Sequence, residues 1–188
     1  GAGTIGLTSE DFDGDGKVDI ATTFNTTTKA AVYYGIDGGI FETRSHHMKN
    51  DTSYSFATAD FNSDGNLDVV APAMWSNGVE VLLASKDSTY DTMNFVTAGW
   101  MPSHVSIADL NNDNKLDLVI TNSGEASFHV ALGNGDGTFE PSEKYNLFAN
   151  GWRSIVADLN KDGFMDVAQT INVFNGAVQV FLGDGTGK

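Results

Sequence analysis

Short runs of alternating apolar and polar residues recur along this chain, separated by turns rich in glycine and aspartate. Residues 79–83, 128–132 and 178–182 are the clearest of these runs. Alternation with a period of two over about four to eight residues is typical of a half-buried β-strand. The pattern therefore predicts a chain built from short antiparallel strands joined by tight turns.

The runs fall into a repeat of 49 residues that holds four strand-like segments. In the second repeat the first three segments are residues 55–59, 67–71 and 79–83, and the fourth opens at Tyr90. A period of about 20 to 50 residues is the signature of a repeat architecture. Because four such strands cannot bury both faces of their sheet alone, we expect the sheets to stack around an axis as a β-propeller, with a stacked solenoid as the alternative.

We therefore expect an all-β fold, a β-propeller of four 49-residue, four-stranded repeats that form one domain over residues 1–188. The repeats are approximately residues 1–49, 50–98, 99–147 and 148–188. The last repeat lacks its outermost strand, because the chain ends where that strand would begin. Three explanations stay open: the chain is part of a larger propeller, a neighbouring subunit covers the open edge, or a four-bladed ring tolerates a three-stranded blade.

A nine-residue acidic loop joins the first and second segments of each repeat, and its four copies start 49 residues apart. Positions 1, 3 and 5 are always Asp or Asn, position 9 is always Asp, and position 7 varies. Calcium takes about six to eight oxygen ligands in forgiving geometry, so these side chains and the backbone carbonyl at position 7 suit it. The candidate ligands of up to four structural Ca²⁺ ions are Asp11, Asp13, Asp15, Lys17, Asp19, Asp60, Asn62, Asp64, Asn66, Asp68, Asp109, Asn111, Asp113, Lys115, Asp117, Asp158, Asn160, Asp162, Phe164 and Asp166.

The residues after the loop separate it from an EF-hand, which carries Glu at position 12 and a helix on each side. Position 12 is occupied here by Thr22, Ala71, Ile120 and Gln169. The alternative to calcium is four metal-free Asx turns, because Asp, Asn and Gly also dominate ordinary turns. Four copies in fixed register favour calcium, and the third loop fits least well because Asn114 replaces glycine where a sharp turn needs positive φ.

Charge narrows the range of partners. The formal net charge is −15, from 25 acidic and 10 basic residues, and thirteen of the acidic residues lie in the four loops. These carboxylates repel one another without a cation, so we expect folding to be coupled to calcium. An acidic chain without a basic cluster argues against nucleic acid, and no apolar run approaches the ~20 residues of a membrane span.

Several features favour a location outside the cell, in a secreted or cell-surface protein. Calcium sites of modest affinity work where calcium is millimolar. Asn25 and Asn50 each begin an N-glycosylation sequon, which predicts a glycoprotein. Cysteine is absent, so no disulfide is available to indicate the redox compartment.

Strand alternation places the acidic loops at one end of the sheets and a group of aromatic residues at the other. Exposed aromatic side chains stack on sugars or anchor proteins, so this opposite face is the candidate site for a protein or glycan ligand. The alternative is that the tryptophans fill the gaps between blades. The candidate ligand-binding residues are Tyr54, Trp75, Trp100, Trp152 and Arg153.

The combined pattern resembles the FG-GAP/VCBS repeats. An acidic loop such as residues 60–68 runs into Leu-Asp-Val, and Leu-Gly-x-Gly-x-Gly-x-Phe closes the repeat, as at residues 132–139. The resemblance covers nearly the whole chain. It implies a calcium-binding propeller like those of integrin α-subunits and of secreted lectins, polysaccharide lyases and adhesins, but it implies no single ligand or activity.

We therefore expect an extracellular, calcium-stabilised propeller module for adhesion or structural assembly. It is expected to be non-enzymatic, because neither Gly-x-Ser-x-Gly nor His-Glu-x-x-His occurs. The alternatives are a carbohydrate-binding lectin and a non-catalytic scaffold domain of a secreted polysaccharide-active enzyme. The expected partners are a protein or glycan on the face opposite the calcium loops and further copies of the chain at the open blade edge, with neither nucleic acid nor membrane insertion.

Overall fold

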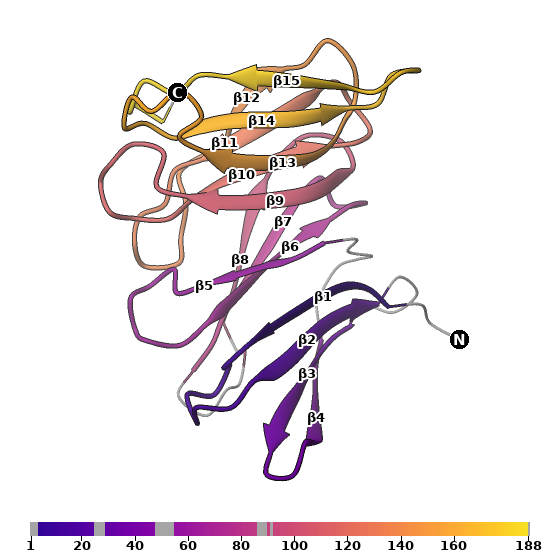
Figure 1. Ribbon diagram of the computed structural model, residues 1–188, viewed down its shortest axis with the longest axis vertical. Coiled ribbons are helices and arrows are strands. Elements are labelled where there is room, and N and C mark those ends of the chain that lie inside the picture. The colour runs from indigo at the N-terminus through magenta and orange to yellow at the C-terminus, as the bar shows by residue number, and fades with distance from the viewer. Residues whose placement is uncertain (1–3, 25–28, 48–54, 86–89, 91, 188) are drawn as a thin grey trace.

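The computed structural model describes residues 4–24, 29–47, 55–85, 90 and 92–187. Within these residues all regular structure is β, with fifteen strands in four antiparallel sheets and no helix. Each sheet is a meander whose strands pair in chain order. Figure 1 shows the sheets following one another from the N-terminal to the C-terminal end of the molecule, and we name them blades 1 to 4.

The strands are three to eight residues long, as the short alternating runs predict. Blade 1 contains β1 (Thr4–Glu10), β2 (Asp19–Phe24), β3 (Lys29–Ile36) and β4 (Ile40–His47). Blade 2 contains β5 (Ala57–Ala59), β6 (Asp68–Ala73), β7 (Gly78–Leu83) and β8 (Thr92–Thr97). Blade 3 contains β9 (Pro102–Ala108), β10 (Asp117–Asn122), β11 (Ser127–Ala131) and β12 (Glu143–Asn146). Blade 4 contains β13 (Gly151–Ala157), β14 (Asp166–Ile171) and β15 (Ala177–Phe181).

The predicted all-β, propeller-type fold with four-stranded repeats is confirmed. Over the described residues blade 4 has three strands, as the sequence predicts. All strands of a blade fall within one predicted repeat, while the extent of the single domain stays a prediction. Blades 1 and 4 lie at opposite ends of the stack over the described residues (Figure 1).

The outermost strand of blade 3 begins later than its aromatic residue predicts. Phe139 pairs with Gly133 in an isolated bridge, and β12 starts only at Glu143. Pro141 lies between them and has no backbone N–H, so it cannot donate to a continuous ladder. The aromatic residue therefore marks the return toward the blade and not the first residue of the strand.

The apolar cores lie between blades. Successive side chains of a strand point to opposite faces of its sheet, so one face packs on the preceding blade and the other on the following blade. Between blades 2 and 3, Val79 and Val81 pack with Val105, Leu118 and Ile120, and all of them are 0–2% exposed. Burying each such side chain contributes about 1.5–3 kcal/mol relative to leaving it exposed.

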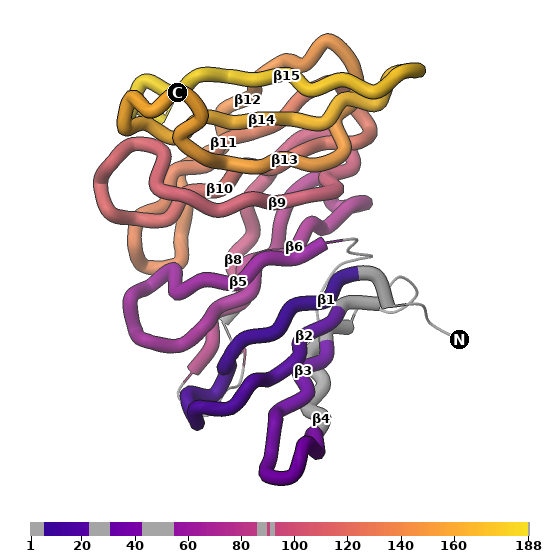
Figure 2. Tube along the Cα trace, viewed as in Figure 1, coloured from indigo at the N-terminus to yellow at the C-terminus, as the bar shows by residue number. Residues whose placement is uncertain are grey.

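The same packing recurs at the neighbouring interfaces. Phe128 and Val130 of blade 3 pack against Val167 of blade 4. Tyr34 of blade 1 packs with Phe56 of blade 2. The tube in Figure 2 shows the blades following one another, with the turns of successive blades along two opposite edges.

Candidate metal centres and the aromatic face

The four acidic loops follow one backbone path, each between the first and second strands of its blade, and positions 4 and 6 have positive φ in every copy. At position 6, φ is 84–92° in Gly16, Gly65 and Gly163 and 63° in Asn114. Position 4 has the same handedness even at Lys161, where φ is 65°, a requirement that the sequence analysis missed. Because Asn visits this region more readily than most residues, the third loop keeps the shape of the others.

The aspartate at position 1 organises each loop through its two oxygens. In the second loop, Asp64 N donates to Asp60 Oδ1 at 3.1 Å and Gly65 N donates to Asp60 Oδ2 at 2.8 Å. The equivalent bonds of the other three loops are 2.8–3.2 Å long. Asn66 N donates in turn to Asp64 Oδ1 at 2.8 Å, so the loop curls around its own carboxylates.

The aspartate at position 9 is buried and fastens the loop to the third strand of its blade. Asp68 Oδ2 accepts from Phe61 N, and its Oδ1 accepts from Ala84 N, both at 2.8 Å. The equivalent bonds of the other blades are 2.7–2.8 Å. The spacing alone suggested only a metal ligand here. A carboxylate oxygen can accept further bonds, so the predicted ligand role of Asp68 is neither confirmed nor contradicted.

The first loop brings three carboxylates together. Asp11, Asp13 and Asp15 each offer an oxygen, and these atoms lie within 4.8 Å of one another. An all-oxygen donor set fits a hard cation such as Ca²⁺, so an aspartate cluster that can hold a metal ion is present. These three residues would hold the ion, and the carbonyl of Lys17 and the carboxylate of Asp19 stay predicted ligands. In the other three loops Asn at position 3 supplies an amide oxygen instead.

The loops carry excess negative charge. Burial, together with the nearby carboxylates of Asp64 and Asp60, raises the pKa of Asp68 to about 6. Lys17 offsets part of the charge in the first loop: its Nζ lies 2.8 Å from Asp15 Oδ2, and this hydrogen bond lowers the pKa of Asp15. A bound divalent cation would supply the remaining compensation, since it would be the largest local charge in the site.

The three tryptophans lie at the end of the strands opposite the acidic loops. Trp75 is in the turn between β6 and β7, Trp100 is between β8 and β9, and Trp152 is near the start of β13. Each is more than half exposed, so they do not fill the gaps between blades. Figure 1 shows the turns of this end along one edge of the molecule and the acidic loops along the other. Tyr54, together with the sequon residues Asn25 and Asn50, lies outside the described residues.

The backbone carbonyls of two tryptophans each accept a hydrogen bond from another residue. Gly124 N donates to Trp100 O at 3.2 Å, and Ser103 Oγ donates to Trp152 O at 3.2 Å, which links blades 3 and 4. Met101, next to Trp100, has a φ of 53°, an unusual value for a non-glycine residue. Arg153 is exposed beside Trp152, where the register of β13 shifts. Shared exposure at one end of the strands is therefore established for the three tryptophans and Arg153, but a ligand is not.

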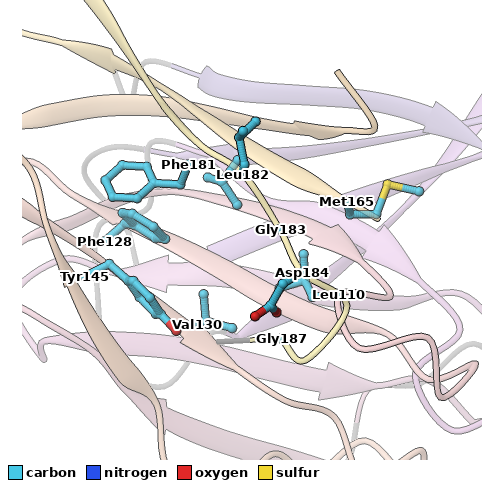
Figure 3. Close-up of a pocket in the computed structure, with 11 residues that line it drawn as sticks. Leu110, Phe128, Val130, Tyr145, Met165, Phe181, Leu182, Gly183, Asp184 and Gly187 are labelled. Atoms are coloured by element: carbon cyan, nitrogen blue, oxygen red, sulfur yellow. The ribbon is translucent and has the colours of Figure 1, made fainter. Parts of the chain in front are cut away.

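A small apolar cavity between blades 3 and 4 was not anticipated. Figure 3 shows Phe128 between Tyr145 and Phe181 at its wall, with Leu182 and Asp184 at its rim. The rings of Phe128 and Tyr145 stack at 5.0 Å, and Phe181 meets Phe128 edge-on at 4.9 Å. Burial raises the pKa of Tyr145, and its buried hydroxyl makes no hydrogen bond within the described residues. The residues of this cavity come from strands far apart in the chain, so no local motif indicates it.

Fold and loops together define a propeller-type repeat protein with acidic, oxygen-rich loops. The FG-GAP-like repeat profile matches residues 11–71 and 109–168. The chain therefore belongs to the FG-GAP-like repeat family, which confirms the resemblance seen in its motifs. No curated protein sequence matches the chain.

Solved structures with the same fold come from diverse proteins. An Agrocybe aegerita lectin that recognises non-reducing terminal N-acetylglucosamine is 23% identical with a TM-score of 0.63, over 97% of this chain and 50% of the lectin. BBS1N, solved with ARL6DN, is 10% identical with a TM-score of 0.63, over 98% of this chain and 58% of BBS1N. The V. cholerae biofilm matrix protein Bap1 is 17% identical with a TM-score of 0.50, over 98% and 38% of the two chains.

These identities support the fold alone. The chain spans 38–58% of the length of the three structures, so their whole-protein activities do not transfer to it. Among the described segments, no helix has the length and apolar character needed to cross a membrane.

Proposed function

We propose that this chain is a non-enzymatic, calcium-stabilised interaction module of an extracellular protein, used for adhesion or structural assembly. The observation that carries the proposal is the fourfold repetition of one loop structure, with the same left-handed positions and the same aspartate hydrogen bonds in every copy. Each copy therefore presents the same pattern of aspartate and asparagine oxygens, which suits a hard cation such as Ca²⁺.

The calcium ions in this proposal are structural. The aspartate at position 9 connects the loop to the third strand of the blade, as Asp68 does through Phe61 N and Ala84 N. A cation held by the exposed end of the same loop would stiffen this connection and neutralise the carboxylates around it. Such sites work where calcium is abundant, which supports an extracellular location.

Calcium titration by calorimetry tests the proposal. Chelator-treated protein is expected to bind up to four Ca²⁺ ions and to gain in melting temperature. Magnesium is expected to bind more weakly because it prefers strict octahedral sites. Failure to bind calcium at millimolar concentration would refute the structural role. Turnover of a polysaccharide by this chain alone would refute the non-enzymatic assignment and favour an enzyme over a scaffold.

Glycan binding at the aromatic end is a second candidate, favoured by the exposure of Trp75, Trp100 and Trp152 on one side of the molecule. Aromatic rings offer flat apolar surfaces on which sugars stack. Glycans that end in N-acetylglucosamine, the ligand of the similar lectin, are the first probes.

A glycan array distinguishes this candidate from protein adhesion. We expect binding to be lost in Trp100→Ala or Trp152→Ala and kept in Ile36→Ala, a matched control at an exposed apolar position toward the other end of the strands. Circular dichroism must show that each variant is folded. No glycan bound by the folded parent protein would exclude the lectin and leave a protein ligand.

A further inference from the structure

The glycine-rich turns that follow the third strands of blades 3 and 4 each contact the acidic loop of the preceding blade. We call these turns, residues 133–139 of blade 3 and residues 183–187 of blade 4, the docking turns. Thr138 N donates to Asp136 Oδ1 at 2.9 Å, and the equivalent bond in blade 4 is also 2.9 Å long. Both docking turns therefore hold the same shape through local hydrogen bonds.

Gly137 joins the docking turn of blade 3 to three elements of blade 2. Its N–H donates to the carbonyl of Phe61 in the second acidic loop at 3.2 Å. Its own carbonyl accepts a bond from Asn94 Nδ2 of β8 at 2.9 Å. A methyl group on Gly137 would come within 2.6 Å of the side chain of Leu83, the last residue of β7. Because Gly137 also has a φ of 81°, a residue with a side chain would be strained here and would displace its neighbour.

Phe61 connects this contact to the candidate metal ligands. It is the second residue of its loop, so it lies between the predicted ligands Asp60 and Asn62. Its N–H donates to Asp68 Oδ2 at 2.8 Å. Its ring meets the ring of Phe139, the last residue of the docking turn, edge-on with the centroids 5.5 Å apart. Blade 3 therefore holds, by one hydrogen bond and one ring contact, the residue that separates two candidate ligands of blade 2.

The junction of blades 3 and 4 repeats the arrangement. A methyl group on Gly187 would come within 2.7 Å of the side chain of Leu132, the leucine that follows β11. The same methyl group would lie 3.2 Å from the Cβ atom of Asn111, a predicted ligand of the third loop. Figure 3 shows Gly187 in the cavity wall together with Leu110, which is the counterpart of Phe61 in the third loop. Contact between a docking turn and the preceding acidic loop is thus a regular feature of the two junctions.

We propose that a docking turn is a positioning element for the metal site of the preceding blade. The turns of blades 3 and 4 fix the loops of blades 2 and 3 for the cation without supplying a ligand. This inference rests on the proposed calcium-stabilised function, and it assigns the support of the second site to Gly137 and Asn94. Replacing groups that orient metal ligands typically weakens metal binding about 10- to 100-fold. By thermodynamic reciprocity, a cation bound in the loop strengthens the contact between the two blades by the same factor.

Glycine-selective nitrogen-15 labelling reports each loop separately by NMR. The N–H groups of Gly16, Gly65 and Gly163 donate to the first aspartate of the first, second and fourth loops, so their signals follow calcium binding site by site. In Gly137→Ala, the calcium concentration that half-saturates the Gly65 signal is expected to rise about tenfold. The Gly16 and Gly163 signals are expected to keep the half-saturation concentrations of the parent protein.

Gly39→Ala is the matched control. Gly39 occupies the repeat position of Gly137 and has a φ of 73°, but a methyl group there meets no atom of the described residues within 4 Å. It adds the same kind of backbone strain without touching another blade, so all three signals are expected to keep the parent values. Asn94→Ala removes only the bond to the Gly137 carbonyl. It is expected to weaken the second site about threefold, and it tests the contact even where Gly137→Ala does not fold.

Amide exchange at Gly137 tests the reverse direction. Calcium is expected to slow exchange of the Gly137 N–H about tenfold in the parent protein, and to leave it unchanged in Asp64→Ala, which lacks a candidate ligand of the second loop. An unchanged Gly65 titration in the folded Gly137→Ala and Asn94→Ala proteins, or equal weakening of all sites, would overturn the inference and leave the calcium function standing. Glycine signals that do not respond to millimolar calcium in the parent protein would overturn both.

Discussion

The two ends of the strands are built by different rules. At the loop end, four copies share the same positive φ angles and the same hydrogen bonds from aspartate oxygens. At the aromatic end the residue types differ between blades. The position of Trp75 is occupied by Gly124 one repeat later, and the position of Trp100 by Ala149. The end that stabilises each blade is repeated, whereas the opposite end varies, and a varied surface on a rigid scaffold is where binding specificity is usually built.

Removal of divalent cations is expected to cause the largest loss of stability, through the acidic loops. Each site at tenfold excess over its dissociation constant contributes about 1.4 kcal/mol to stability, and the freed carboxylates repel one another. A chelator should therefore lower the melting temperature by several degrees or more, as followed by circular dichroism. Recovery with calcium but not with added sodium is the control, and a melting temperature that does not change would contradict the difference between the two ends.

Loss of one buried aspartate is expected to be the next largest effect. Asp68→Ala leaves Phe61 N and Ala84 N without their acceptor. Because an unsatisfied buried donor costs about 1–3 kcal/mol, the free energy of unfolding in urea should fall by about 2–4 kcal/mol. Trp75→Ala at the exposed end should change it by less than about 0.5 kcal/mol. Equal effects of the two substitutions would show that the ends do not differ in stability.

Acidification is expected to weaken the contact between blades 3 and 4 near the aromatic end. Ser154 N donates to His104 Nδ1 at 3.4 Å, and burial, with a smaller effect of Arg153, lowers the pKa of His104 to about 4. The unfolded state, with a pKa near 6.5, binds the proton more readily, so stability is present above pH 6.5 and is lost as pH falls toward 4. The His104 contribution should fall by about 2 kcal/mol between pH 7 and pH 5.

The difference between wild type and His104→Gln isolates this contribution, because the carboxylates titrate in both proteins. Urea unfolding at a series of pH values measures it. Parallel pH profiles for the two proteins would mean that His104 does not couple protonation to this interface.

The smallest expected effect comes from one loop alone. Asp64→Ala should remove or weaken one calcium site, leave the other three occupied, and cost about 1.4 kcal/mol at tenfold excess of calcium. Calorimetric stoichiometry before and after the substitution measures the change. Loss of all sites at once would mean that the loops act as one cooperative unit, and unchanged stoichiometry would remove position 5 from the ligand set.

Much of the architecture follows from local rules. The 49-residue period predicts four blades, and strand alternation predicts the orientation of their faces. Glycine at position 6 predicts the left-handed turn that Gly65 makes. The repeated aromatic position alone did not predict the late start of β12 after Phe139, because it takes no account of Pro141, which interrupts the ladder.

Part of the candidate metal site was also predictable from the sequence. The spacing of Asp11, Asp13 and Asp15 predicts their convergence, since alternate side chains of a tight loop reach one point, and the structure brings them together. The second role of Asp68 was not predictable, because its partner Ala84 lies sixteen residues away, just after the end of β7. The exposure of Trp152 was not predictable either, because it depends on how much of its side chain the neighbouring blade covers.

By itself, then, the sequence determined the number of blades, the chemistry of the acidic loops and the left-handed turn at their sixth position, since turn preference and strand period act within a few residues. Only the tertiary structure decided which of its equivalent apolar residues are buried. Val81 and Val180 occupy the same position in the repeat, yet one is 0% and the other 48% exposed. The hydrophobic effect depends on the area that a neighbour removes from water, and no pattern within one repeat contains that neighbour.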